Sequence, residues 1–162
     1  MKRSFKQIGD ELRLYWSNYV FQSLLATASM FIVLLLLSTH EVVIAASIGA
    51  TSFIIFAMPK SITANAKNVI GGYVAGIFSG SLFALIPHEM LMLPSIAVYS
   101  LSVGLAMFIM VVTDTEHPPA GATALGVSIH GFNIGVAITT LGSVVILSLI
   151  HHYFKRYLRD LV

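Results

Sequence analysis

The chain has 162 residues, of which 57% are hydrophobic and only 10% are Asp, Glu, Lys or Arg, whereas a soluble domain carries about 25% charged residues. Its mean hydropathy of +0.88 exceeds what a soluble fold of this size can bury, because such a fold must cover its surface with polar groups. The composition therefore excludes most soluble folds and predicts an all-α helix bundle in contact with a lipid bilayer. A net charge of +2 is too small to indicate nucleic acid as a partner, and the absence of cysteine excludes disulfides.

Residues 1–16 are predicted to form an amphipathic helix at the membrane surface. Phe5, Ile8, Leu12 and Tyr15 recur at helical spacing among charged residues, and Trp16 follows them. Tryptophan favours the headgroup level of a bilayer. Residues 17–162 are expected to form a single transmembrane domain.

Five uncharged runs follow, each close to the ~20 residues that a helix needs to cross the hydrocarbon. They lie near 19–38, 42–58, 69–86, 95–113 and 132–152. A further uncharged stretch precedes the last run, and it begins with Pro118-Pro119. It predicts a short helix over about 119–129, ~17 Å long at 1.5 Å per residue, or about half the hydrocarbon thickness.

The basic residues test whether this short helix crosses the membrane. If it crosses, the chain makes six passes and both termini lie on the cytoplasmic side. All nine Lys and Arg residues then lie on that side too, as the positive-inside rule requires. If it returns as a hairpin, Lys155, Arg156 and Arg159 lie outside. We favour six passes, in a bacterial inner membrane.

A short motif occurs twice. Ile48-Gly49-Ala50-Thr51-Ser52 is followed 72 residues later by Ala120-Gly121-Ala122-Thr123-Ala124, and each copy comes after a polar break with His and Glu, His40-Glu41 or Glu116-His117. Units with three passes each have opposite orientations. The motif therefore predicts a 3+3 inverted repeat with halves at about 19–86 and 95–154, an arrangement that places transporter sites near the bilayer midplane.

The densest polar group precedes the second copy of the motif. Proline at 118 and 119 suits a first helical turn, where the free N–H groups of Gly121 and Ala122 and the Thr123 hydroxyl could hold a small anion. His117 would add a positive charge, and Asp114 and Glu116 would keep it protonated or relay a proton. A polar helix cap at the membrane surface explains these residues equally well.

The first copy is the second part of the candidate site. Gly49, Ala50, Thr51 and Ser52 could mark an unwound crossing that binds the same anion, although close helix packing is the favoured interpretation. No catalytic residue, cofactor or metal site is expected, because the motifs of phosphate loops, zinc proteases and nucleophile elbows are missing.

Two further features lie in the region after the first copy. Lys67 and Asn68 stand at the start of the next helix and could attract anions, or the lysine could only set topology. Gly72, Gly76 and Gly80 are four residues apart, which predicts a close helix contact. This face is also a candidate contact in a homo-oligomer.

The stretch Glu116-His117-Pro118-Pro119-Ala120-Gly121-Ala122-Thr123-Ala124-Leu125 resembles the signature of the HPP family of small integral membrane proteins. Gly49-Ala50-Thr51 and Lys67-Asn68-Val69-Ile70-Gly71-Gly72 are similar to the other conserved region of that family. Tyr73 departs from the pattern, since a His often follows the Gly pair. Lys67 replaces an expected Arg and loses bidentate anion recognition.

The resemblance implies anion transport, because chloroplast and cyanobacterial members of this family are nitrite transporters. It also implies four membrane spans, which differs from our six segments. We therefore expect a non-enzymatic transporter or channel for a small monovalent anion, with nitrite as the first candidate. The alternative is a non-transporting membrane scaffold or sensor subunit that acts with a soluble regulatory partner.

Overall fold

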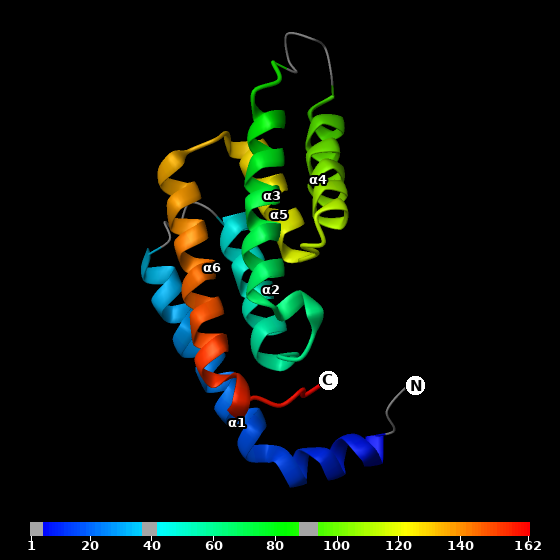
Figure 1. The fold of residues 1–162 in the computed structure, drawn as a ribbon, viewed down its shortest axis with the longest axis vertical. Coiled ribbons are helices and arrows are strands. Elements are labelled where there is room, and N and C mark those ends of the chain that lie inside the picture. Colours follow the sequence, from blue (N-terminus) through cyan, green and yellow to red (C-terminus); the bar gives the residue numbers. More distant parts are fainter. Residues whose placement is uncertain (1–4, 37–41, 88–93) are drawn as a thin grey trace.

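The computed structural model describes residues 5–36, 42–87 and 94–162 (Figure 1), with side chains from Gly9 onward. Every regular element in these ranges is a helix, which confirms the all-α bundle. The elements are α1 (Phe5–Leu36), α2 (Val42–Ala57), η1 (Ile62–Ala64), α3 (Ala66–Ala84), α4 (Ser95–Val112), α5 (Pro119–His130), α6 (Ile134–Phe154) and η2 (Lys155–Tyr157). The break at His40-Glu41 lies outside the described residues.

Each of the five predicted spans coincides with a helix, but the helices differ in their fitness to cross a membrane. Among the described residues, three are long and apolar enough: Gly9–Leu35, Ser95–Val112 and Ile134–Tyr157. The α2 helix is apolar but shorter. Large apolar side chains such as Phe31, Ile96 and Phe108 are exposed on the outside of the bundle, where lipid covers them in a membrane protein.

The N-terminal helix continues into the first span with a kink. Tyr15 has non-helical backbone angles (φ −122°, ψ 21°) inside α1. The part before it lies across the lower end of the bundle in Figure 1, and Trp16 is exposed directly after it. The change of direction occurs where the sequence predicted the end of a surface helix, although the chain bends there without leaving the helix. The position of this first part at a membrane surface stays a prediction.

The six α-helices alternate in direction, and the start of α1 and the C-terminal residues lie at the same end (Figure 1). The short helices α2 and α5 both begin near mid-height and run to opposite ends. In the first set of three helices α1 packs on α2, and in the second set α4 packs on α5 in the same way. The third helix of each set contacts the first two helices of the other set: α3 contacts α4 and α5, and α6 contacts α1 and α2. This pattern is unchanged when the two sets of three helices are exchanged, in agreement with an inverted repeat.

The glycine face of α3 is the tightest contact in the bundle. A Cβ atom added at Gly76 would lie 2.5 Å from the carbonyl oxygen of Ala120, and one at Gly80 would lie 2.6 Å from that of Ala124. The predicted close helix contact is therefore confirmed. Its suggested use in a homo-oligomer is wrong, because α5 of the same chain carries small residues at matching positions and fills this face.

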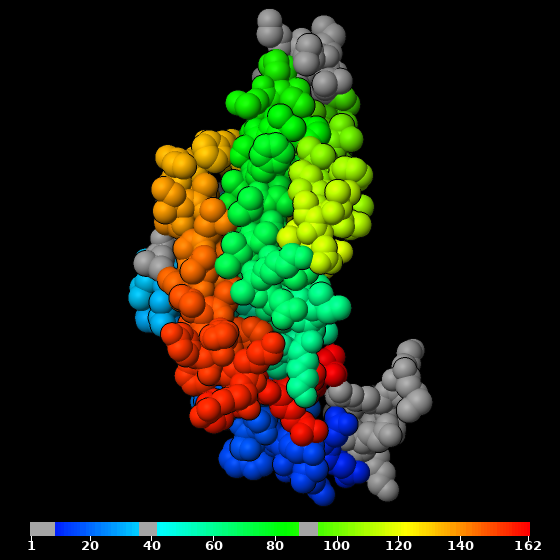
Figure 2. Space-filling model, in the orientation of Figure 1, coloured from blue at the N-terminus to red at the C-terminus, as the bar shows by residue number. Residues whose placement is uncertain are grey.

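The C-terminal residues are tied to the middle of α1 and to the end of α2. The buried Gln22 side chain donates to the carbonyls of Phe56 and Arg159 and accepts from the Arg159 N–H. The Leu161 N–H donates to the Ala57 carbonyl at 2.9 Å. Figure 2 shows these C-terminal residues, in red, packed against α1, in blue. The first half of the bundle is therefore held together by the end of the second.

Candidate functional site

The helix that follows the two prolines begins and ends close to its predicted limits. α5 covers Pro119–His130, with Pro119 at its first position, against the predicted 119–129. The N–H of Ala120 donates to the His117 carbonyl at 3.0 Å, and that of Gly121 to the Pro118 carbonyl at 3.1 Å. The Gly121 amide is thus not free, as the sequence argument assumed, because a tight first turn satisfies it. An anion at this helix start therefore cannot use the Gly121 amide.

His117 is buried between the helices, with no exposed surface. Its Nδ1 is 2.8 Å from the Thr63 carbonyl oxygen, and its Nε2 is 2.7 Å from Thr51 Oγ1. A carbonyl oxygen only accepts, so we assign the ring proton to Nδ1. These partners are neutral, and burial among them favours the uncharged imidazole.

Four hydroxyl side chains continue from this histidine. The Tyr73 hydroxyl lies 2.9 Å from both Ser47 Oγ and Thr51 Oγ1. Ser47 Oγ is also 2.6 Å from the Pro119 carbonyl oxygen and 2.9 Å from Thr123 Oγ1. Each of these side chains is buried. We call Ser47, Thr51, Tyr73, His117 and Thr123 the hydroxyl–histidine cluster, and it joins α2, α3, α5 and the loop before α5.

The two copies of the repeated motif meet at this cluster through their threonines. Ser47 bridges the copies, because it contacts Thr123 directly and lies one helical turn before Thr51. Gly49 is half-buried, with open space beside its Cα, and Ala50 is exposed. The α2 helix runs without a break through these residues. They are therefore neither an unwound crossing nor a glycine contact.

Ser52 differs from its neighbours in the first copy. Its side chain is only 3% exposed, yet its hydroxyl has no hydrogen-bond partner among the residues that the structure describes. It borders an open apolar groove between α1 and α2, together with Gly49 and Phe53. Ser52 thus lies outside the hydroxyl–histidine cluster.

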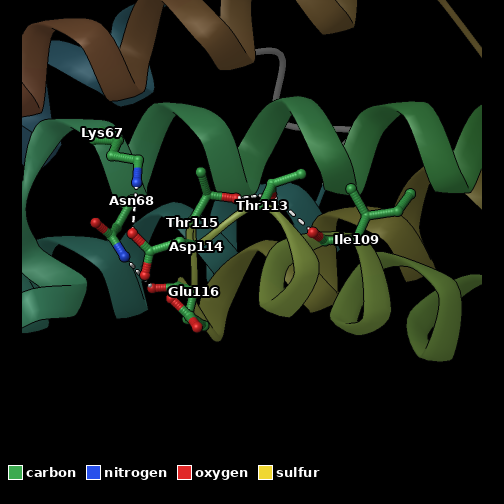
Figure 3. A network of polar contacts seen from close by, with 7 residues as sticks. All are labelled: Lys67, Asn68, Ile109, Thr113, Asp114, Thr115 and Glu116. Atoms are coloured by element: carbon green, nitrogen blue, oxygen red, sulfur yellow. Dashed lines mark hydrogen bonds and ion pairs between the residues drawn. The ribbon is translucent and has the colours of Figure 1, made fainter.

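Asp114, which was expected to act on His117, pairs with a lysine instead (Figure 3). Asp114 Oδ2 lies 2.7 Å from Lys67 Nζ, and both side chains are mostly exposed. The hydrogen bond from the Lys67 ammonium lowers the pKa of the Asp114 carboxyl. Asn68 donates to the Glu116 carbonyl at 3.3 Å. Lys67 and Asn68 therefore attach the loop before α5 to the start of α3, and Asp114 is paired with the lysine and not with the histidine.

A groove on the outside of the bundle borders the loop that carries the histidine, although the imidazole itself has no exposed surface. It has a volume of about 340 Å³ and runs between α4 and the start of α5. Apolar side chains form the α4 side, and four residues form the other side: Glu116, His117, Pro118 and Gly121. Glu116 is thus the predicted relay residue that borders the same groove as His117.

A comparison with known protein families shows which family the chain belongs to. Residues 12–159 match the family model described as HPP, transmembrane region. The chain belongs to the HPP family. The match extends from α1 into the C-terminal residues, so it confirms the resemblance carried by the His-Pro-Pro motif and makes this HPP protein an integral membrane protein. No curated protein and no solved structure matches the chain.

Sequence reasoning missed three parts of the site in this HPP protein. Ser47 and Tyr73 belong to the cluster, and the Thr63 carbonyl holds His117. A signal for Ser47 was present, since it lies four residues before Thr51 and so on the same helix face. Tyr73 stood out only as a departure from the family pattern. Nothing in the sequence indicates the partnership of Thr63 and His117, which lie 54 positions apart.

Proposed function

We propose that this HPP protein is a membrane transporter or channel for a small monovalent anion, with nitrite as the first candidate substrate. One observation carries the proposal: the hydroxyl–histidine cluster lies fully buried where two short helices meet in a bundle of apolar helices. Polar and ionisable side chains inside a membrane are costly, and they commonly mark the paths of substrates and ions. Helices that begin near the middle of a bundle are a common setting for transporter sites.

The residue types of the cluster suit a small anion. Hydroxyl groups of serine, threonine and tyrosine can donate hydrogen bonds to it, and His117 can supply one positive charge when it is protonated. One histidine balances one negative charge, which favours a monovalent ion.

The competing function is a scaffold or sensor in which the cluster serves only to join α2, α3 and α5. Its hydroxyl groups are well bonded to one another, as a purely structural network requires. Hydrogen bonds between membrane helices contribute about 0.6 kcal/mol each on average. A scaffold would lose stability but no transport when the cluster is altered, so transport itself decides between the two functions.

The experiment is nitrite uptake by proteoliposomes that contain the purified protein. Protein-free liposomes give the background, because nitrous acid crosses lipid unaided. We expect the wild type to exceed this background and His117→Ala to fall to it. The matched control is Thr27→Val, which removes an exposed hydroxyl that bonds only within α1 and should leave uptake unchanged.

Size-exclusion chromatography establishes that each variant is folded. Wild-type uptake no faster than that of protein-free liposomes would overturn the proposal for nitrite. Full uptake by folded His117→Ala would remove the cluster from the pathway.

A further inference from the structure

The directions of the hydrogen bonds in the cluster follow from the carbonyl groups at its two ends. The Thr63 carbonyl accepts from His117 Nδ1, so Nε2 of the neutral ring must accept. The Thr51 hydroxyl therefore donates to Nε2 across 2.7 Å. At the other end, the Pro119 carbonyl accepts from the Ser47 hydroxyl across 2.6 Å.

The remaining two hydroxyl hydrogens are then also assigned. Ser47 Oγ has given its own hydrogen to Pro119, so it accepts from Thr123 across 2.9 Å. The Tyr73 hydroxyl donates to Thr51 or to Ser47, both at 2.9 Å. Within the cluster every O–H and N–H hydrogen is in use. As long as His117 is neutral, the cluster has no donor left for an anion.

A proton on His117 reverses this direction. The new hydrogen is on Nε2, whose partner is Thr51 Oγ1, so the threonine oxygen must accept. The Thr51 hydrogen then turns to the Tyr73 oxygen at 2.9 Å or to the Ser47 carbonyl at 3.2 Å. Tyr73 no longer needs to donate to Thr51. One added proton thus supplies a positive charge and releases a hydroxyl donor together.

We propose that the anion binds only together with a proton on His117, so that the protein moves the two together, and that the Tyr73 hydroxyl turns to the bound anion. This rests on the proposed function and adds its coupling. The proton reaches His117 from water in the groove that Glu116 and His117 border when the imidazole, which has no exposed surface in this structure, turns toward the groove, and it returns there when the anion leaves. The imidazolium and the anion cancel in charge, which lowers the cost of a charge in the bilayer.

In the described parts of the chain, few other ionisable groups lie on the elements that pack against His117. Neither α2 nor η1 carries an ionisable side chain. From α3 come Tyr73, whose ring centroid is 5.7 Å from that of His117, and Lys67, which is paired with Asp114 at the surface. From the loop before α5 comes Glu116. The side of α4 in the groove is apolar.

The experiment follows protons and nitrite in the same proteoliposomes, with a pH-sensitive dye trapped inside and protein-free liposomes as background. With an inward nitrite gradient, we expect the wild type to acidify the lumen in step with nitrite uptake. Uptake should rise about tenfold for each unit by which the pH falls, until His117 is saturated with protons, since one bound proton gives a unit slope. These measurements need no variant.

Two variants assign the effect to residues. His117→Gln keeps a hydrogen-bonding side chain but cannot gain a proton, so its residual uptake should have no pH slope. Tyr73→Phe should keep the slope and raise the KM for nitrite severalfold. Tyr153→Phe removes an exposed tyrosine hydroxyl and should match the wild type.

The outcomes separate the two proposals. Nitrite uptake by the wild type without accompanying protons, or an unchanged slope in His117→Gln, would overturn the coupling and leave the proposed function in place. No uptake above that of protein-free liposomes would overturn the proposed function, and the coupling with it.

Discussion

The two short helices carry the same Gly-Ala-Thr motif, yet they are packed differently. Against α5, α3 lies so close that a Cβ at Gly76 or Gly80 would touch a backbone carbonyl of α5. In α2, Gly49 has open space beside it. The difference teaches that the repeated motif does not itself determine the packing. The glycines of α3 hold α5 close, whereas the motif glycine of α5 itself, Gly121, would place a Cβ no nearer than 3.7 Å to its first neighbour.

The two helices also differ in what they bring to the site. From α2 come two hydroxyl side chains, Ser47 and Thr51, on one helix face. The α5 side brings His117 and the Pro119 carbonyl, which together define the direction of the hydrogen bonds, as well as Thr123. The α2 side thus supplies hydroxyl groups that can turn, and the α5 side supplies the group that can change its charge.

The largest expected effect comes from a methyl group on the tight side. In Gly76→Ala the new Cβ meets the Ala120 carbonyl oxygen at 2.5 Å, and backbone cannot move aside as a side chain can. We expect a loss of about 2–3 kcal/mol in the free energy of unfolding. The matched control Gly49→Ala, in open space within a helix, should gain about 0.5–1 kcal/mol. Thermal unfolding in detergent measures both, and equal Tm values for the two variants would contradict the packing difference.

An intermediate effect is expected from two buried serines of α2. Ser47→Ala removes a hydroxyl with three partners, and we expect a loss of about 1–3 kcal/mol because those partners stay buried. Ser52→Ala removes a hydroxyl that has no partner, so stability should not fall. Denaturant unfolding of both variants checks this difference. An equal loss in the two would show that Ser52 has a structural partner, and a fall in nitrite uptake at unchanged stability would place Ser52 on the substrate path.

Local features of the sequence were sufficient to predict part of this arrangement. The prolines predicted where α5 begins, the glycine spacing predicted a close contact along α3, and the change from charged to apolar residues predicted that a first segment ends near residue 16, next to the bend at Tyr15. These features depend on neighbours in sequence or on one helix face. They do not depend on how distant helices are arranged.

The rest depended on tertiary structure. Ser47, Thr63 and Tyr73 meet His117 or its hydroxyl partners only because α2, α3 and α5 converge. The proximity of Asp114 to His117 in sequence was misleading. Asp114 adopts a left-handed conformation (φ 54°), and its carboxylate pairs with Lys67 while His117 enters the bundle. A turn of this kind has no clear sequence signal, since Asp only tolerates it more readily than most residues.

The smallest effect is expected at this Lys67–Asp114 pair, which attaches the loop before α5 to α3. Lys67→Gln should raise the pKa of the Asp114 carboxyl toward its ordinary value, because the ammonium that lowers it is gone. A carboxyl with a lowered folded-state pKa contributes stability above its unfolded pKa, and that contribution disappears as the pH falls through the folded value. Lys67→Gln should therefore lower the Tm slightly at neutral pH, less in high salt, and not at all in acid.

The carboxyl chemical shift of Asp114, followed by NMR against pH, measures the pKa directly. Lys60→Gln is the matched control, because the side chain of Lys60 is exposed and its backbone N–H makes the bond to Asp160. A Tm loss in Lys67→Gln that persists in acid would show that the lysine acts by packing rather than by charge. The start of α5 would then depend on contacts of the Lys67 stem in addition to the ion pair.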